Sequence, residues 1–322
     1  MTIKRNVLRV LNQLSIQFAY GHREILLDYM KIPYDYILNG FLQHGVGPAE
    51  LCEPRTPWSP KLFRRYDHYV FSSHVTLGQK EAGWQEGIPI GSPWLYLCQG
   101  VTGKTPSLKG EKGFVVFPRH RNLSMQSDAE KNIEKRIKVW LKIASGQEMT
   151  ICLYHSEFAD MAWHKVCNQV GVKLWCNGVP DTPIPWSLYS GRVNFLKNLH
   201  NLLDRASVAY FEDYTSAIFY AGFLRKTVLY KKYNFKKHDI AYPKTETYQN
   251  KKFEMDLKNI AFINKKYGIK TDGVNDSNHF YSVCDLFLGL SDVLTPKQLR
   301  EKVEFLQIPE LCYPNENQND KL

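Results

Sequence analysis

The sequence predicts an α/β protein in which a parallel sheet carries helices on both of its faces. The main observation is that short apolar runs alternate with helical segments between residues 113 and 230. Such alternation is typical of βαβ units, whose strands pair in parallel. The second observation is the length of 322 residues, which predicts two domains. The third is a Gly- and Lys-rich stretch at 103–113, the best candidate for the linker between them.

The first third of the chain carries weaker patterns of the same kind. Residues 1–30 are expected to be helical, because apolar side chains recur at helical spacing between Val7 and Phe18. Two buried strands, a helix and a third strand interrupted by Pro93 are expected to follow, at 36–42, 68–72, 75–82 and 88–98.

From residue 113 onward the pattern is cleaner. The helical segments are amphipathic and the strands are short apolar runs. The predicted elements, in order, are strand 113–117, helix 129–144, strand 149–154, helix 158–170, strand 172–176, helix 193–204, strand 207–211, helix 217–224 and strand 227–230. A doubly wound sheet binds its ligand beyond the carboxyl ends of its strands, so site residues are expected there.

The last third of the chain is more polar. Helices are expected at 254–266, 279–288 and 296–305. The final residues, 311–322, are rich in Asn and Asp and are expected to be disordered.

Composition favours a soluble protein of a reducing compartment. Hydrophobic residues make up 43% of the chain and charged residues 23%, as in ordinary globular proteins. No apolar run has the length of a membrane span, and the N-terminus lacks a signal-peptide core. The seven cysteines are scattered without a CxxC pair, which argues against a disulfide framework or a zinc site. We therefore expect a cytoplasmic protein.

The formal net charge of +10 favours an anionic partner. The one local concentration of basic residues is 225–237, where Tyr and Phe are interleaved with Lys. It carries no zinc-finger, RNA-recognition or basic-zipper signature, so nucleic acid is not expected as a partner. A solvated basic face explains the cluster most simply, and peripheral contact with an anionic inner-membrane surface is the alternative.

The turn after the predicted strand 207–211 is the best candidate for a phosphate site. It contains Asp213, Thr215 and Ser216 at the start of a helix. Hydroxyls, unpaired backbone N–H groups and the positive end of the helix dipole converge there, which suits a phosphate. The alternative is that one of these side chains is only an N-cap.

Further basic positions are candidates for the same role. Strand 113–117 ends in Pro118-Arg-His-Arg121, where His120 and Arg121 are candidate phosphate ligands because Arg binds phosphate in a bidentate way. Arg192 lies at the start of a helix, where the dipole disfavours a cation unless an anion holds it there. A surface turn and a surface salt bridge are the respective alternatives.

The turn after the predicted strand 36–42 contains the candidate base. His44 lies between Gln43 and Gly45, and its imidazole titrates near neutral pH while glycine lets a ligand approach the backbone. Glu50 is the second candidate, with Glu53 close behind it. A purely structural histidine is the alternative.

Missing motifs disfavour several chemistries. The sequence has no GxGxxG and no GxxxxGK[ST], which argues against a dinucleotide oxidoreductase and a P-loop nucleotidase. It also lacks the GxSxG nucleophile elbow. No DxD follows a predicted strand, so no metal ligand is assigned and no cofactor is expected.

Three of these segments together resemble bacterial GT-B glycosyltransferases and related transferases that build surface polysaccharides. They are Gln43-His-Gly45, Phe117-Pro-Arg-His120 and Asp213-Tyr-Thr-Ser-Ala-Ile-Phe-Tyr-Ala221. The last is similar to the phosphate-facing turn and buried helix of capsule sialyl- and Kdo-transferase-like proteins and of CDP-glycerol polymerases. Two motifs of sialyltransferases are absent: the His-Pro dipeptide, since Arg121 follows His120, and the acidic dipeptide-Gly motif that supplies their base.

The resemblance implies two Rossmann-like domains whose parallel sheets face a cleft. The expected division is 1–104 for an acceptor-side domain, 105–250 for a nucleotide-binding domain, 251–310 for helices that cross back, and 311–322 for the tail. The implied reaction moves a sugar, first choice a CMP-activated acidic sugar, from a nucleotide-sugar donor to a glycan or lipid-linked glycan without a metal. The alternatives are a polyol- or glycerol-phosphate transferase on this fold and a basic nucleic-acid-associated protein.

Overall fold

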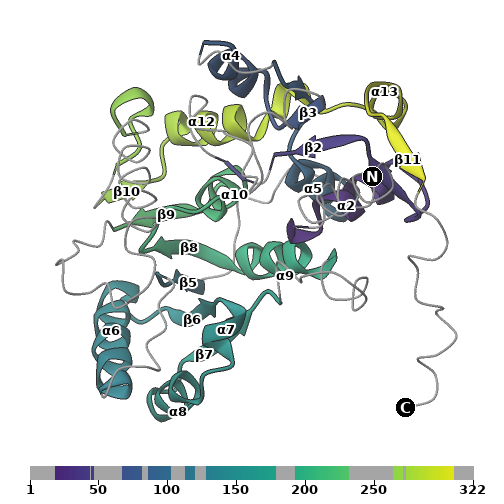
Figure 1. Cartoon of the computed structure of the whole chain (residues 1–322). Coiled ribbons are helices and arrows are strands. Elements are labelled where there is room, and N and C mark those ends of the chain that lie inside the picture. The colour runs from purple at the N-terminus through teal and green to yellow at the C-terminus, as the bar shows by residue number, and fades with distance from the viewer. Residues whose placement is uncertain are drawn as a thin grey trace, which may run out of the picture.

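The computed structural model describes residues 19–43, 45–46, 67–81, 86–102, 113–119, 128–178, 193–231, 264–270 and 273–307. These residues form a six-stranded sheet, a three-stranded sheet and a two-stranded ribbon, with helices packed around them (Figure 1). The α/β class with parallel sheets is thereby confirmed. Among the same residues, no helix is both long enough and apolar enough to cross a bilayer.

The large sheet holds the elements that the sequence predicts most clearly. Its strand order is β10-β9-β8-β5-β6-β7, and every pair is parallel except β10 with β9. The strands are β5 (Gly113–Phe117), β6 (Glu148–Leu153), β7 (Lys173–Cys176), β8 (Ala206–Phe211), β9 (Thr227–Tyr230) and β10 (Gly273–Asn275).

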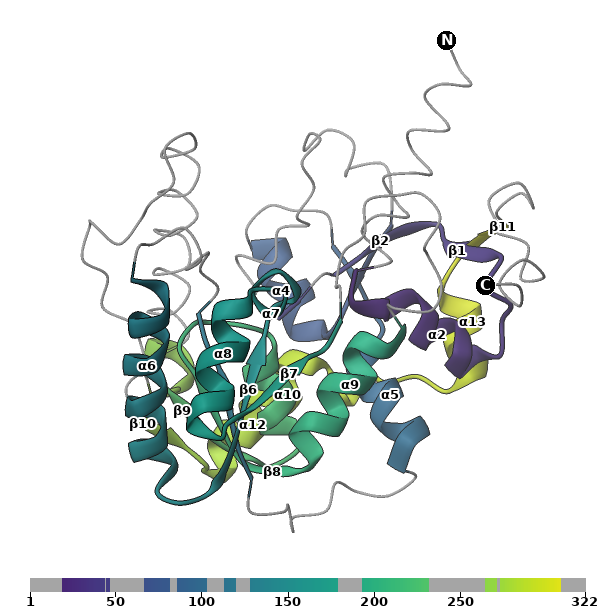
Figure 2. The ribbon, with the colours of Figure 1, turned by 90° about the horizontal axis from the view of Figure 1, so that it is seen from below.

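Helices cover both faces of this sheet, as Figure 2 shows. On one face, α6 (Ala129–Ala144) and α8 (Met161–Val170) pack on Phe114 and Val116 of β5. On the other face, Leu202 of α9 (Val193–Asp204) covers Val115. The alternation of side chains along a strand thus buries both faces, which explains why β5 is apolar at every position from Phe114 to Phe117.

The small sheet is also parallel and consists of β2 (Gly40–Leu42), β3 (Asp67–Val70) and β4 (Ile88–Pro89). Around it lie three helices: α2 (His22–Met30), α4 (Ser73–Glu81) and α5 (Pro93–Thr102). The ribbon pairs β1 (Tyr36–Leu38) with β11 (Phe305–Gln307), so residues near the end of the described chain lie beside its beginning. Helix α13 (Pro296–Lys302) precedes β11 and packs against α2.

Helix α12 (Asn278–Leu288) links the two sheets. It packs against α10 (Ala217–Phe223) so closely that a Cβ on Gly222 would lie 2.3 Å from the Cys284 sulfur. At its other end, the Leu288 carbonyl accepts a hydrogen bond from the Ser92 backbone N–H at 2.9 Å. Buried side chains of both sheets and of α12 form one continuous hydrophobic cluster. The predicted domain boundaries nevertheless stay a prediction.

Two predicted elements of the first third are wrong in detail. The single strand 36–42 is split at Asn39, whose backbone N–H turns to the Glu304 carbonyl at 2.8 Å, so β1 and β2 pair with different partners. The predicted strand 88–98 is a strand only at 88–89, and Pro93 begins α5. Proline suits the first turn of a helix, and the Ser92 hydroxyl accepts from the Trp94 N–H at 3.3 Å.

In the last third, sequence periodicity misses two short strands and lengthens one helix. The helix predicted for 296–305 ends at Lys302, and β11 follows it. The edge strand β10 is also unpredicted. Expected elements or tails at 1–18, 103–112, 254–263 and 311–322 lie outside the described residues.

Candidate functional site

Two turns at the carboxyl ends of parallel strands meet between the sheets. We call them the β2 turn (Gln43, Gly45 and Val46) and the β8 turn (Glu212–Ser216). The Val46 backbone N–H donates to the Ser216 hydroxyl oxygen at 2.9 Å, although 170 residues separate them in the chain. The Tyr214 hydroxyl donates to the Val46 carbonyl at 3.3 Å. The segment predicted to carry the base and the turn predicted to bind phosphate are therefore in contact.

The β2 turn is held in place by the side chain of Gln43. Its amide nitrogen donates to the Gly45 carbonyl at 2.6 Å, and its amide oxygen accepts from the Phe71 backbone N–H at 2.7 Å. A Cβ on Gly45 would lie 2.6 Å from the Ser216 hydroxyl oxygen, so a side chain fits at this position only if that hydroxyl moves. The candidate base His44 lies between these two residues in the sequence. His44 itself and Glu50 fall outside the described residues.

The backbone N–H groups at the start of α10 bond within the β8 turn, whereas the sequence predicts unpaired N–H groups there. The Thr215 hydroxyl oxygen accepts from the Ala217 N–H at 3.5 Å, and the next amides bond to the Thr215 and Ser216 carbonyls. The first-turn N–H groups thus have partners within the turn, as the N-cap alternative requires. Ser216 does not cap α10 with its side chain but accepts from Val46 instead. Both hydroxyl groups are half-buried and retain their O–H as a donor toward a ligand.

Arg119 brings the end of β5 to the same place. Its Nε lies 3.8 Å from Oδ2 of Asp213, whose other carboxylate oxygen accepts from the Tyr214 N–H at 2.8 Å. The Asp213 side chain is 49% exposed, so this ion pair is open to exchange with an incoming anion. The neighbouring candidates His120 and Arg121, like Arg192, lie outside the described residues.

Sequence reasoning missed the importance of Glu212 and Arg136. Glu212 is only 7% exposed, and its carboxylate pairs with the Arg136 guanidinium and accepts from the Trp140 indole N–H at 3.0 Å. One sequence signal could have found this pair. Arg136 stands three residues after Ile133 and four before Trp140, so it occupies a core-facing position of the amphipathic helix α6.

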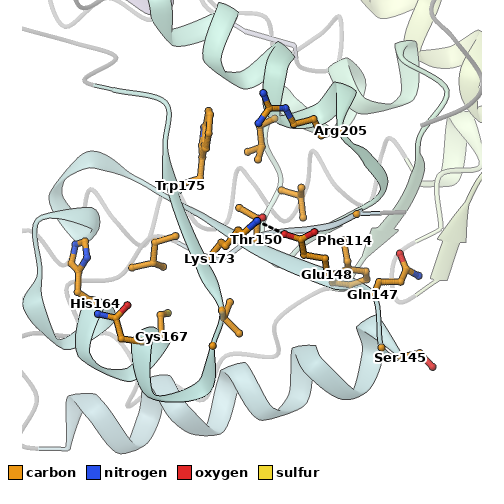
Figure 3. Close-up of a pocket in the computed structure, with 18 residues that line it drawn as sticks. Phe114, Ser145, Gln147, Glu148, Thr150, His164, Cys167, Lys173, Trp175 and Arg205 are labelled. Atoms are coloured by element: carbon orange, nitrogen blue, oxygen red, sulfur yellow. Dashed lines mark hydrogen bonds and ion pairs between the residues drawn. The ribbon is translucent and has the colours of Figure 1, made fainter. Parts of the chain in front are cut away.

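A cavity among the described residues lies away from the two turns. This cavity of about 1040 Å³ opens at the amino ends of β5, β6 and β7, with Trp175 and Arg205 among its lining residues (Figure 3). It contains none of the predicted site residues. Its Glu148–Lys173 ion pair is largely exposed. Since open α/β sheets bind ligands at the opposite, carboxyl ends of their strands, we assign the candidate site to the two turns.

The part of the chain that the structure describes offers no ready metal site, and the Cys167 thiol is a weak acid. That part of the chain contains no cluster of three or more His, Cys, Asp or Glu side chains that could hold a metal ion. Burial raises the pKa of the Cys167 thiol to about 11, which leaves little thiolate at neutral pH. Independence of metal and of other cofactors stays a prediction.

No protein-family model matches the sequence, and no curated protein matches it. Among solved structures, MnaA from S. aureus in complex with UDP is similar over 84% of this chain and 65% of its own, with a TM-score of 0.35 and 12% identity. The UDP-GlcNAc 2-epimerase from Methanocaldococcus jannaschii is similar over 73% and 61%, with a TM-score of 0.31 and 11% identity. A variant of TarM from S. aureus, in complex with fondaparinux, α-GlcNAc-glycerol and UDP, is similar over 80% and 48%, with a TM-score of 0.33 and 11% identity. The chain thus spans less than two thirds of the length of each.

Proposed function

We propose that this protein is a metal-independent glycosyltransferase that moves a sugar from a nucleotide-sugar donor to a glycan acceptor, on a GT-B-like arrangement of its two parallel sheets. The observation that carries the proposal is the contact of the β2 turn with the β8 turn through Val46 and Ser216. A transferase of this kind needs a base for the acceptor and anion-stabilising groups for the donor within reach of one another. The two turns supply candidates for these two roles from two different sheets.

In the proposed reaction, His44 accepts the proton of an acceptor hydroxyl, with Glu50 as the second candidate for this role. The acceptor oxygen bonds to the anomeric carbon of the donor sugar, while the bond from that carbon to the phosphate oxygen breaks. The leaving nucleotide phosphate carries the developing negative charge. Cationic groups and O–H donors stabilise this charge. The proposed groups are Arg119, His120 and Arg121 after β5, Thr215 and Ser216 of the β8 turn, and Arg192. Asp213 would accept from a hydroxyl of the nucleotide or hold Arg119 between turnovers.

The partners follow from charge rather than from a pocket shape. A formal net charge of +10 suits an anionic substrate, so a CMP-activated acidic sugar is the first choice for the donor. The acceptor would be a surface glycan or its lipid-linked precursor. A lipid-linked acceptor would bring the protein to the inner face of the membrane, where its basic residues favour peripheral contact with anionic lipids.

The test is a thermal-shift series with CMP, CDP, UDP, GDP and ADP, each with and without EDTA. One nucleotide is expected to raise the Tm selectively, since a ligand at a hundred times its Kd stabilises the native state by about 2.7 kcal/mol. The shift should survive EDTA and should shrink in Thr215→Ala. A flat response to all five nucleotides would contradict the proposal. A shift seen only with Mg²⁺ would contradict metal independence, and salt-sensitive binding of DNA or RNA would support the nucleic-acid alternative instead.

A further inference from the structure

The carboxylate of Glu212 joins the ends of β5 and β8, where the candidate phosphate-binding groups begin. The last backbone hydrogen bond between the two strands runs from the Glu212 N–H to the Phe117 carbonyl at 3.1 Å. Pro118 follows β5 and has no N–H that could continue the pairing of the two strands. The side chain of Glu212 takes over at this point, because its Oε2 accepts from the Arg119 backbone N–H at 3.2 Å.

The same carboxylate is locked from its other side by helix α6. The Arg136 guanidinium pairs with Oε2, and the Trp140 indole N–H donates to Oε1 at 3.0 Å. The guanidinium carbon of Arg136 lies 5.0 Å from the centre of the Trp140 ring and 5.8 Å from that of Trp163. A buried carboxylate needs such a cation and such donors to offset the loss of water. Glu212 is therefore fixed in position.

The carboxylate of Asp213, the next residue in the chain, is in a different environment from that of Glu212. Asp213 is half-exposed and lies 3.8 Å from Nε of Arg119, a loose ion pair in contact with solvent. The backbone N–H of Arg119 thus bonds to the buried Glu212 carboxylate, and its side chain pairs with the half-exposed Asp213 carboxylate. This division leaves the guanidinium able to exchange Asp213 for a phosphate while its main chain stays in place.

We propose that Glu212 is the positioning residue of the candidate nucleotide site. It holds the Arg119 main chain, at the end of β5, against the β8 turn. The inference rests on the proposed function, because it assigns Glu212 a role in the site that the β8 turn is proposed to form. It predicts that the affinity for nucleotide depends on the Glu212 carboxylate more than on the other members of the buried network.

The test compares Glu212→Gln with Trp140→Phe. The first variant removes the charge that Arg136 pairs with and leaves one carbonyl oxygen for three donors: the Arg119 amide, the Arg136 guanidinium and the Trp140 indole. The second removes only the indole donor and keeps the carboxylate, Arg136 and the Arg119 bond. Both variants lose stability, so stability alone does not separate a positioning role from a structural one. Three quantities are measured on each: the free energy of unfolding, the hydrogen-exchange rate of the Arg119 amide, and the Kd for each of CMP, CDP, UDP, GDP and ADP.

Glu212→Gln is expected to weaken binding of the nucleotide that wild type binds best at least about fivefold and to speed exchange of the Arg119 amide at least about tenfold. Trp140→Phe is expected to change the Kd less than about twofold and to keep the Arg119 amide protected. Should Glu212→Gln not fold, Glu212→Asp serves in its place, because it keeps the charge but is too short to reach both Arg119 and Arg136. Equal losses of affinity in the Glu212 and Trp140 variants would overturn the proposal, as would unchanged exchange at Arg119.

The two hypotheses fail in different ways. If wild type binds one of the five nucleotides and Glu212→Gln binds it equally well, the positioning role is wrong while the proposed function stands. If wild type binds none of the five nucleotides, the proposed function fails and takes the nucleotide role of Glu212 with it, whatever the exchange rate at Arg119.

Discussion

Replacing Gly289 with alanine is expected to destabilise the protein by at least about 3 kcal/mol. Gly289 ends α12 with a φ of +72°, a conformation that side chains disfavour. A Cβ at this position would also lie 1.9 Å from the backbone carbonyl oxygen of Phe71, which cannot rotate away. To relieve the clash, α12 would have to withdraw from the end of β3, and the packing between the two sheets would loosen.

Gly171 provides a matched control for this prediction. It ends α8 with nearly the same φ, +71°, but a Cβ there would meet no atom within 4 Å. Gly171→Ala should therefore cost only the backbone term of about 1 kcal/mol. Urea unfolding of wild type and the two variants measures the difference. Equal losses in Gly171→Ala and Gly289→Ala would mean that α12 does not abut β3 as the structure has it.

Replacing His44 with alanine is expected to lower the chemical step by about two to four orders of magnitude, the usual contribution of a general base. Nucleotide affinity should change less than about twofold, since the donor phosphates are assigned to the β8 turn and the end of β5. The measurement is single-turnover transfer from the nucleotide sugar that the thermal-shift series selects, made on the same preparation as the Kd and the Tm.

Other outcomes for His44→Ala point to specific errors. Normal turnover with a lowered Tm would make His44 a structural residue and pass the base role to Glu50. A loss of nucleotide affinity as large as the loss of rate would place His44 on the donor side of the site.

Sequence periodicity predicts the large sheet well, because each of its βα units is local. The strands 113–117 and 227–230 and the helices 129–144 and 193–204 have the bounds that their apolar patterns predict. The ribbon of β1 and β11 could not be predicted in the same way. Its partners are about 270 residues apart, and each strand is only three residues long, too short for a period to register.

The candidate site was predictable in its parts and not in its assembly. The turn with Thr215 and Ser216 stands out in the sequence through its hydroxyls, and Gln43-His-Gly45 stands out through its position after a strand. Nothing local signals that Val46 donates to Ser216, because that bond depends on how the sheets pack. The same reason hid Glu212, whose burial becomes evident only when α6 places Arg136 and Trp140 over it.

A double-mutant cycle between Gly45 and Ser216 tests most directly whether the β2 turn and the β8 turn form one site. Gly45→Ala places a Cβ 2.6 Å from the Ser216 hydroxyl oxygen, so that hydroxyl must rotate and release the Val46 N–H. Ser216→Ala loses the same hydrogen bond, for a cost of about 1 kcal/mol. Without that hydroxyl, the nearest atom of residue 216 to the new Cβ at position 45 is the Cβ of residue 216, at 3.9 Å, which is an ordinary contact.

The measured quantity is the free energy of unfolding of wild type, of each single variant and of the double variant. If the two turns meet, Gly45→Ala is costly in wild type and nearly neutral in the Ser216→Ala background, with a coupling energy of about 1 kcal/mol or more. Strictly additive effects of Gly45→Ala and Ser216→Ala would contradict the contact, and with it the joint site on which the proposed transferase depends.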